Sequence, residues 1–300
     1  MPQGLVLRQC TILNIDLRIS KMKRKKFLKR LAILGGIAAI PGIYAWQVEP
    51  FWLEFVHHKM PVKNLPKHLH GKKLMHISDV HIGDFFDYQY IIDSFKQAQQ
   101  LHPDFVVYTG DFVTYEEPKN LEQLAEVIPY FPTGNLGSVG ILGNHDYGID
   151  YKEAHVAQNI IDQLASRDIH ILRNEAKDLN GLHFLGIDDY WGINFYPENA
   201  TKNYDPKTAN IALCHNPDVC DLDVWKGYQG WILSGHTHGG QCKPPFLRAP
   251  ILPVENKRYD AGIIDLYDGR TLYINRALGC LRQMRFNVRP EITIFELQPA

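Results

Sequence analysis

Cysteine is scarce in this sequence, and the five cysteines present form no C-x-x-C pair. An odd number without paired spacing argues against a disulfide framework and against a structural zinc knot. The chain can still fold, because 45% of its 300 residues are hydrophobic and 22% are charged. This composition excludes a disordered or collagen-like protein and allows one large domain or two small ones.

Net charge is almost absent as well, at −1, but this average conceals an uneven distribution. Residues 21–30 contain seven of the 32 basic residues and no acidic residue, whereas residues 243–290 contain nine basic and four acidic residues. The remainder of the chain is therefore acidic. Because no long basic stripe with interleaved aromatic residues is present, we expect no nucleic acid as the main partner.

The N-terminal region predicts an export signal or a membrane anchor. Basic residues 21–30 precede sixteen uncharged residues, 31–46, a run slightly shorter than the roughly 20 that span a bilayer comfortably. The positive-inside rule places residues 21–30 in the cytoplasm and the residues after 46 beyond the membrane. Residues 24–29 (RKKFLK) are similar to a twin-arginine export motif. Cleavage of this segment and its burial as a core helix are the alternatives.

Met22 stands directly before this basic segment, whereas a signal normally begins at the start of a chain. We therefore expect residues 1–20 to be either the product of a misassigned start, with Met22 as the true one, or a tail without structural meaning. The expected organisation is a non-structural extension at 1–20, the basic segment and anchor at 21–46, a connector with an edge strand at 47–71, and one catalytic domain at 72–300.

From residue 72 the chain alternates short apolar strands with amphipathic helices, and then changes to strands joined by hairpins. We expect Asn180-Gly181 to be a hairpin turn between the runs 169–179 and 182–187, and Asp268-Gly269 to be one between 261–267 and 271–275. This order predicts an α/β fold in which two packed mixed sheets are flanked by helices. We expect strands at 52–62, 74–78, 105–109, 139–142, 211–214, 231–234 and 291–297, and helices at 88–101, 121–131 and 152–166.

Several of these strands run directly into polar residues, and open α/β sheets bind ligands beyond the carboxyl ends of their strands. Imidazole, carboxylate and amide ligands without sulfur suit manganese, iron or zinc. Seven ligands are too many for one tetrahedral ion and fit two divalent ions that share a carboxylate. The candidate ligands are Asp79, His81, Asp111, Asn144, His215, His236 and His238.

The ordered motifs DxH, GD, GNHD, H and GHTH resemble those of the calcineurin-like metallophosphoesterases over residues 72–297. GHTHGGQ and RFNVRPEIT are similar to a bacterial membrane-associated branch that includes phosphodiesterases and UDP-2,3-diacylglucosamine pyrophosphatases. The resemblance implies a four-layer α/β/β/α sandwich. It also implies one metal on Asp79, His81, Asp111 and His238, and a second on Asp111, Asn144, His215 and His236, with Asp111 bridging.

The same resemblance implies hydrolysis of a phosphodiester or pyrophosphate bond by a hydroxide that bridges the metals. His145 would be the general acid, and Asp146 would orient it. The basic segment 243–290 lies near the site in this family, so substrate phosphate is expected to contact one or more of Arg248, Arg276, Arg282 and Arg285. The N-terminal anchor makes a phospholipid or a lipid-linked nucleotide sugar a sensible substrate.

Two other functions compete with this interpretation. The first is an inactive scaffold that keeps the metal-binding fold and binds partner proteins. The presence of His145 and of the complete ligand set counts against it, because a scaffold requires neither. A metallo-β-lactamase-type hydrolase requires HxHxDH, and GHTHGG lacks the aspartate. The sequence leaves open the natural substrate, the metal identity, the oligomeric state and the choice among diester, monoester and pyrophosphate.

Overall fold

A computed structural model describes residue 26, residues 29–30 and residues 40–300. The predicted extension at 1–20, and most of the predicted basic segment and anchor, lie outside the described residues. Within the described part of the chain, no helix is long and apolar enough to cross a membrane. Residues 43–300 form one compact unit, so residues 43–71 belong to the same body as the strands that follow them.

A mixed sheet of six strands forms one half of this body, in the order β1-β12-β2-β3-β4-β5. Its strands are β1 (Glu54–Val62), β2 (Lys73–Ile77), β3 (Phe105–Thr109), β4 (Gly137–Ile141), β5 (Ile169–Ile171) and β12 (Glu291–Pro299). The strand expected at 52–62 is β1, at the edge of the sheet. Because β2 to β5 pair in parallel, their carboxyl ends open toward the same side of the molecule.

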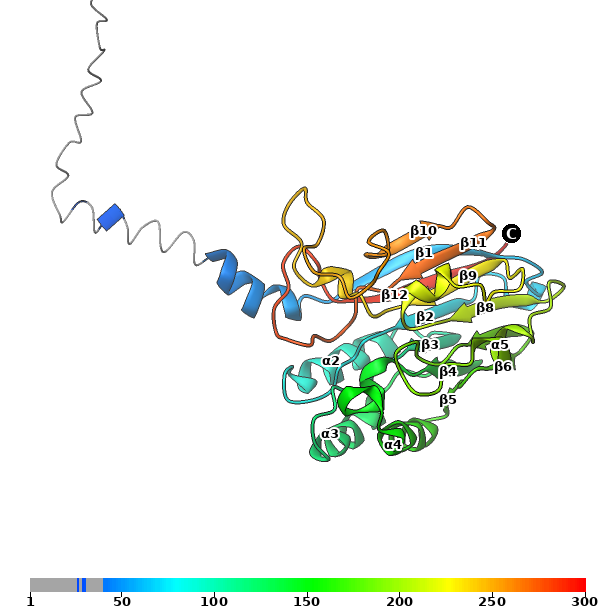
Figure 1. Cartoon of the computed structure of the whole chain (residues 1–300), viewed down its shortest axis with the longest axis horizontal. Helices are drawn as coiled ribbons and strands as arrows, with labels where there is room; N and C mark the ends of the chain where they lie inside the picture. Colours follow the sequence, from blue (N-terminus) through cyan, green and yellow to red (C-terminus); the bar gives the residue numbers. More distant parts are fainter. Residues whose placement is uncertain (1–25, 27–28, 31–39) are drawn as a thin grey trace, which may run out of the picture. The chain divides into compact units, whose positions relative to one another are not determined.

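Three helices cover one face of this sheet, and Figure 1 shows them grouped on one side of the body. They are α2 (Tyr88–Gln99), α3 (Lys119–Val127) and α4 (Ala154–Ala165). The apolar face of α2 lies where the helical spacing predicts it, with Ile91 and Phe95 packed in one buried cluster with Val106 and Tyr108 of β3. Asp87 caps α2, because its carboxylate accepts the Gln89 N–H at 2.9 Å.

The second sheet also has six strands, in the order β10-β11-β9-β8-β7-β6. Its strands are β6 (Glu175–Leu179), β7 (Leu182–Gly186), β8 (Ala209–Leu213), β9 (Gly230–Ser234), β10 (Gly262–Asp265) and β11 (Arg270–Ile274). Both predicted hairpins are confirmed, since β6 and β7, and β10 and β11, are antiparallel neighbours. Asn180 and Gly181 adopt positive φ, as a tight hairpin turn requires.

The two sheets pack face to face through a dry apolar layer that includes Leu74, Val107, Phe184, Ile211 and Leu233. The outer face of the second sheet is covered by the short helix α5 (Pro197–Thr201), a 3₁₀ helix at Pro217–Asp221 and long loops. The predicted α/β fold of two mixed sheets with helices is therefore confirmed. The short helices on the outer face of the second sheet are not predicted by the sequence pattern.

One predicted segment divides between the sheets. The run at 169–179 was expected to be a single arm of the Asn180-Gly181 hairpin, but β5 completes the first sheet and only β6 pairs with β7. Asn174 makes the crossing possible, because it takes a positive φ and its amide oxygen accepts the N–H groups of Asp188 and Tyr196.

Candidate active site

The loops that follow five strands bring the seven predicted ligands together. Asp79 and His81 follow β2, Asp111 follows β3, and Asn144 follows β4. His215 follows β8 in the second sheet, and His236 and His238 follow β9. All seven side chains are buried. The site is therefore built at the carboxyl ends of parallel strands from both sheets.

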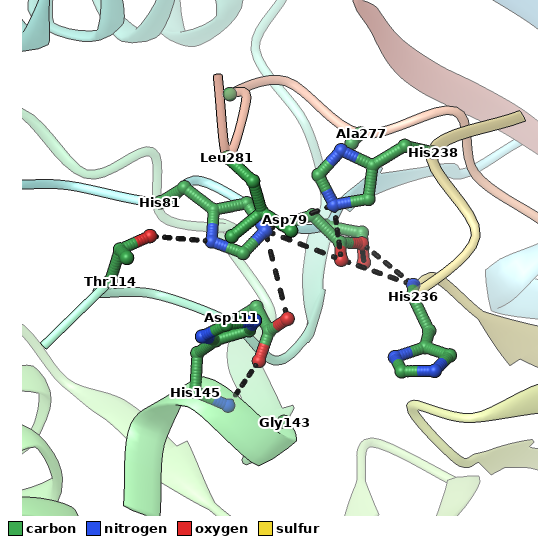
Figure 2. A network of polar contacts seen from close by, with 12 residues as sticks. Asp79, His81, Asp111, Thr114, Gly143, His145, His236, His238, Ala277 and Leu281 are labelled. Atoms are coloured by element: carbon green, nitrogen blue, oxygen red, sulfur yellow. Dashed lines mark hydrogen bonds and ion pairs between the residues drawn. The ribbon is translucent and has the colours of Figure 1, made fainter. Parts of the chain in front are cut away.

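Asp79, His81 and His238 form the first group. The two imidazoles approach each other at their Nε2 atoms, 2.9 Å apart, and His238 Nε2 lies 3.2 Å from Asp79 Oδ1. His81 Nε2 lies 3.8 Å from the same carboxylate oxygen. Figure 2 shows both rings directed at this carboxylate. The three ligand atoms are close enough to hold one metal ion.

Asp111, His215 and His236 form the second group. His215 Nε2 lies 3.2 Å from Asp111 Oδ2 and 3.2 Å from His236 Nδ1. The same Asp111 oxygen lies 3.6 Å from His81 Nε2 in the first group. Asn144 is buried nearby, and its Oδ1 has no hydrogen-bond partner within the described chain. Asp111 thus lies between the two groups.

Hydrogen bonds hold His215 and His236 in tautomers that can bind a divalent metal ion. The Thr109 carbonyl accepts from His215 Nδ1 at 2.6 Å, and the Pro253 carbonyl accepts from His236 Nε2 at 2.9 Å. Each of these bonds fixes the proton on one ring nitrogen and leaves a lone pair on the other, which faces the cluster. A buried cluster of lone pairs and carboxylates requires cations to balance it.

The backbone at the site is unusual. Non-glycine residues rarely adopt a positive φ, and such strain gathers at functional sites. Five of the seven ligands adopt it: Asp79 (52°), His81 (51°), Asp111 (54°), His236 (70°) and His238 (52°).

His145 lies at the edge of the cluster and is half-buried. Its backbone N–H donates to Asp111 Oδ1 at 2.9 Å, as Figure 2 shows. Its ring contacts the His81 ring edge-on, with centroids 5.2 Å apart. The His145 ring therefore lies beside the first ligand group, and its backbone is bonded to Asp111 of the second.

Comparison with known proteins agrees with this geometry. Residues 72–240 match the profile of a family described as calcineurin-like phosphoesterase. The chain belongs to the calcineurin-like phosphoesterase family. This family is metal-dependent, and the two buried groups of Asp and His are close enough to hold metal ions.

Three relatives of this phosphoesterase align along nearly its whole length. Phosphodiesterase YaeI of Escherichia coli K12 is 30% identical over 92% of this chain and 99% of its own. The uncharacterized metallophosphoesterase YkuE of Bacillus subtilis is 30% identical over 93% of this chain and 99% of its own. The UDP-2,3-diacylglucosamine pyrophosphatase LpxG of Chlamydia muridarum is 26% identical over 89% of this chain and 97% of its own.

Asp146 supports the phosphoesterase site through the backbone. Its buried carboxylate accepts N–H groups from Gly143, Asp111, Phe112 and Val113 at 2.8–3.2 Å. These bonds fasten the 3₁₀ helix Asn144–Tyr147 to the loop after β3. Asp146 has no direct hydrogen bond to the His145 side chain among these contacts, and it fixes the backbone of the helix that carries both residues.

The four predicted arginines differ in their exposure and in their partners. Arg248 and Arg282 are exposed. Arg276 is paired with Glu54 and Glu291. The expectation that Arg285 contacts substrate is not supported, because it is completely buried. Its guanidinium donates to the carbonyls of residues 276, 277, 279 and 288, so its role is to hold that loop together.

Asp189 is a site residue that the sequence reasoning missed. It is buried after β7, and its Oδ2 accepts the N–H groups of Trp191 and Gly192, while Oδ1 has no partner in the described structure. Burial raises the pKa of Asp189 to about 7. The signal was available, because Asp188-Asp189 follows an apolar strand in the same way as the predicted ligands do.

An aromatic wall, defined as Tyr151 and Trp191, was also missed. The Trp191 ring contacts ligand His236 edge-on at a centroid distance of 4.5 Å and stacks on Tyr151 at 6.2 Å. Tyr151 in turn contacts His145 at 5.5 Å. Trp191 remains 41% exposed, so the wall presents a flat apolar surface beside the ligands.

Glycine is required where the strand-end loops approach each other. A Cβ on Gly143 would lie 2.3 Å from Asp111 Oδ1. A Cβ on Gly235 would lie 1.9 Å from Ser78 Oγ and 2.1 Å from Asp79 Oδ2. Ser78 also donates to Asp79 Oδ2, so a side chain at residue 235 would displace a bonded pair.

We expect Gly235→Ala to weaken metal binding at the first group by at least about tenfold, equivalent to about 1.4 kcal/mol, because the added methyl group displaces Asp79. Metal titration by calorimetry measures this loss. Gly42→Ala is the matched control, because Gly42, like Gly235, has no positive φ and an added Cβ there meets nothing within 4 Å. Metal affinity equal to the wild type in Gly235→Ala would contradict the expectation.

Proposed function

We propose that this phosphoesterase hydrolyses a phosphodiester or pyrophosphate bond in a membrane-derived lipid or nucleotide-sugar lipid, using two divalent metal ions. The observation that carries the proposal is the position of Asp111 between two buried ligand groups, with His145 beside both. Relatives named as a phosphodiesterase and as a UDP-2,3-diacylglucosamine pyrophosphatase support this choice of bond.

In this proposal Asp79, His81 and His238 hold one ion, and Asn144, His215 and His236 hold the other, with Asp111 shared. When bound, the ions offset the charge of the phosphate and lower the pKa of the attacking water to about 7. Thr109 and Pro253 keep the ligand lone pairs directed inward. His145 protonates the leaving oxygen, and Asp146 keeps the His145 backbone in place.

Metal-stripped protein reconstituted with manganese, iron or zinc in turn tests the proposal. The substrate panel contains an aryl phosphodiester, an aryl phosphomonoester and UDP-2,3-diacylglucosamine. We expect metal-dependent cleavage of the diester or the pyrophosphate, with the effective metal identified by the same series. If all three compounds stay intact with every metal, the inactive scaffold becomes the better interpretation.

The aromatic wall provides a test of substrate class. We expect Trp191→Ala to raise KM about three- to tenfold for substrates with a flat or apolar leaving group, because an aromatic contact contributes about 0.5–1.5 kcal/mol beyond area burial. Steady-state kinetics on methyl and naphthyl phosphodiesters measures the difference. The control is Trp52→Ala, at a similarly exposed tryptophan that contacts Arg289. Equal KM changes for the two diesters would contradict a role in recognition.

We also propose that the N-terminus lies in the cytoplasm and the catalytic body beyond the membrane, following twin-arginine-like export. The support is the basic run at 21–30 followed by the apolar run at 31–46. Proteinase K added to spheroplasts should digest the body. Protection of the body until lysis would place it on the cytoplasmic side.

A further inference from the structure

Two neighbouring loops expose apolar side chains to a degree that is unusual for a folded body. Phe246, Leu247 and Ile251, in the loop between β9 and β10, are 105%, 65% and 76% exposed. Met284, in the loop between β11 and β12, is 49% exposed. We refer to these four residues as the apolar tip. Exposed apolar groups that gather in this way mark a surface that binds a partner or a membrane.

The roots of the two loops are joined by hydrogen bonds, so the tip is one surface. Lys243 N–H donates to the Phe286 carbonyl at 2.8 Å, and Phe286 N–H donates to the Gln241 carbonyl at 2.9 Å. The Gln241 side chain donates to the carbonyls of Arg282 and Met284. In Figure 1 the loop after β9 and the loop before β12 lie at the same end of the body.

The charged residues within the two segments that carry the tip are all basic, and one of them, Lys243, pairs with Asp260 at the root of its loop. Residues 243–254 and 276–290 contain no acidic residue. Arg248 and Arg282 are exposed beside the apolar residues. Apolar side chains flanked by cations match the interface of an anionic membrane, which attracts basic residues to its surface and accepts apolar ones below it.

The N-terminal chain enters the body at this same place. The Ala45 carbonyl accepts the Arg285 N–H at 2.8 Å, Gln283 donates to the Trp46 carbonyl at 3.0 Å, and the Tyr44 ring contacts Phe286. The chain arrives directly from the apolar run at 31–46, and Trp46 is 53% exposed. Residues 44–46, at the start of the compact body, therefore lie against the second loop of the apolar tip.

The tip is also continuous with the metal-ligand cluster. The loop that carries Phe246 and Leu247 returns at Pro253, whose carbonyl binds ligand His236. The second loop also reaches the cluster, because the N–H groups of Leu278 and Gly279 donate to the carbonyls of Ser78 and Asp79 at 3.0 and 2.8 Å. A lipid surface at the tip would therefore adjoin the cluster.

We propose that the apolar tip inserts into the interface of an anionic lipid membrane and seats the catalytic body on it. This surface is distinct from the N-terminal run, and its function does not depend on hydrolysis. Phe246 and Leu247 enter below the headgroups, while Arg248 and Arg282 meet lipid phosphates. The body then lies on the membrane with its ligand cluster beside the lipid, rather than extending away from it on a tether.

Site-specific fluorescence in the full-length protein tests this proposal. Leu247→Cys is labelled with the polarity-sensitive dye NBD in a Cys10→Ser, Cys242→Ser background, since the other three cysteines are buried. The matched control is Tyr267→Cys in the β10–β11 turn, where the side chain is 83% exposed. Protein is reconstituted into phosphatidylethanolamine–phosphatidylglycerol vesicles with or without brominated acyl chains.

We expect a blue shift of the emission at residue 247, with bromine quenching several-fold greater than at residue 267 and weaker in purely zwitterionic vesicles. Phe246→Asp should abolish the quenching at 247 while leaving hydrolysis of a water-soluble diester unchanged. Equal, weak quenching at 247 and 267 would overturn the proposal. Shielding of the 247 label only when a second protein is added would overturn it in favour of a protein partner.

Discussion

Asp111→Asn is expected to lose at least one of the two bound metal ions and to have no measurable hydrolysis. Asp111 Oδ2 lies within 3.2 Å of His215 Nε2 and 3.6 Å of His81 Nε2, so it is placed to serve both ions. Removing its charge leaves both groups with one carboxylate in total. Elemental analysis of the purified variant measures the metal content.

Asparagine is chosen because it keeps the oxygen that accepts the His145 N–H, which limits damage to the fold. The control is Asp93→Asn on α2, whose carboxylate is 57% exposed. We expect the control to match the wild type in metal content and activity. Two metals per chain in a folded Asp111→Asn variant would refute the bridging role.

His145→Ala is expected to keep both metals and to lower kcat by about 10²–10⁴, the usual contribution of a general acid. The prediction follows from position, since the His145 ring contacts the His81 and Tyr151 rings without belonging to either ligand group. Metal content and kcat are measured on the same preparation, with exposed His155→Ala as the control.

The leaving group distinguishes an acid from a residue that merely maintains the site. An alkoxide needs a proton as it departs, whereas p-nitrophenolate does not. The kcat of His145→Ala should therefore fall far more for an alkyl diester than for a p-nitrophenyl diester. Equal losses for the two substrates would indicate that His145 acts by positioning alone.

The predicted ligands lie together because of a property that sequence reveals directly. Short apolar runs mark parallel strands, and the polar residue that ends each run must lie at the same side of the sheet. Asp79, Asp111 and His236 each follow this rule. The glycines before Asp111 and His236 are also visible in the sequence, and they indicate tight turns where loops approach each other closely.

Other parts of the site depend on contacts that sequence does not show. The sequence shows that Arg285 is charged. It does not show that the guanidinium donates to four backbone carbonyls, because those bonds depend on the path of the loop. Trp191 reaches His236 from a different strand-end loop, so no local spacing links the two residues. Residues 169–179 likewise supply an edge strand to each sheet, β5 to the first and β6 to the second, and local spacing does not show this division.

Because β1 pairs with β12, the first sheet can be completed only after the C-terminal residues have been synthesised. Strand β12 contains residues 291–299 and separates β1 from β2 in the first sheet. Neither neighbour can complete its ladder until the final residues leave the ribosome, and such distant pairings form slowly. The edge of the first sheet that carries β1 therefore stays incomplete until synthesis of the chain ends. The loop after β2, which carries Asp79 and His81, thus belongs to a part of the sheet that is completed only at the end of synthesis.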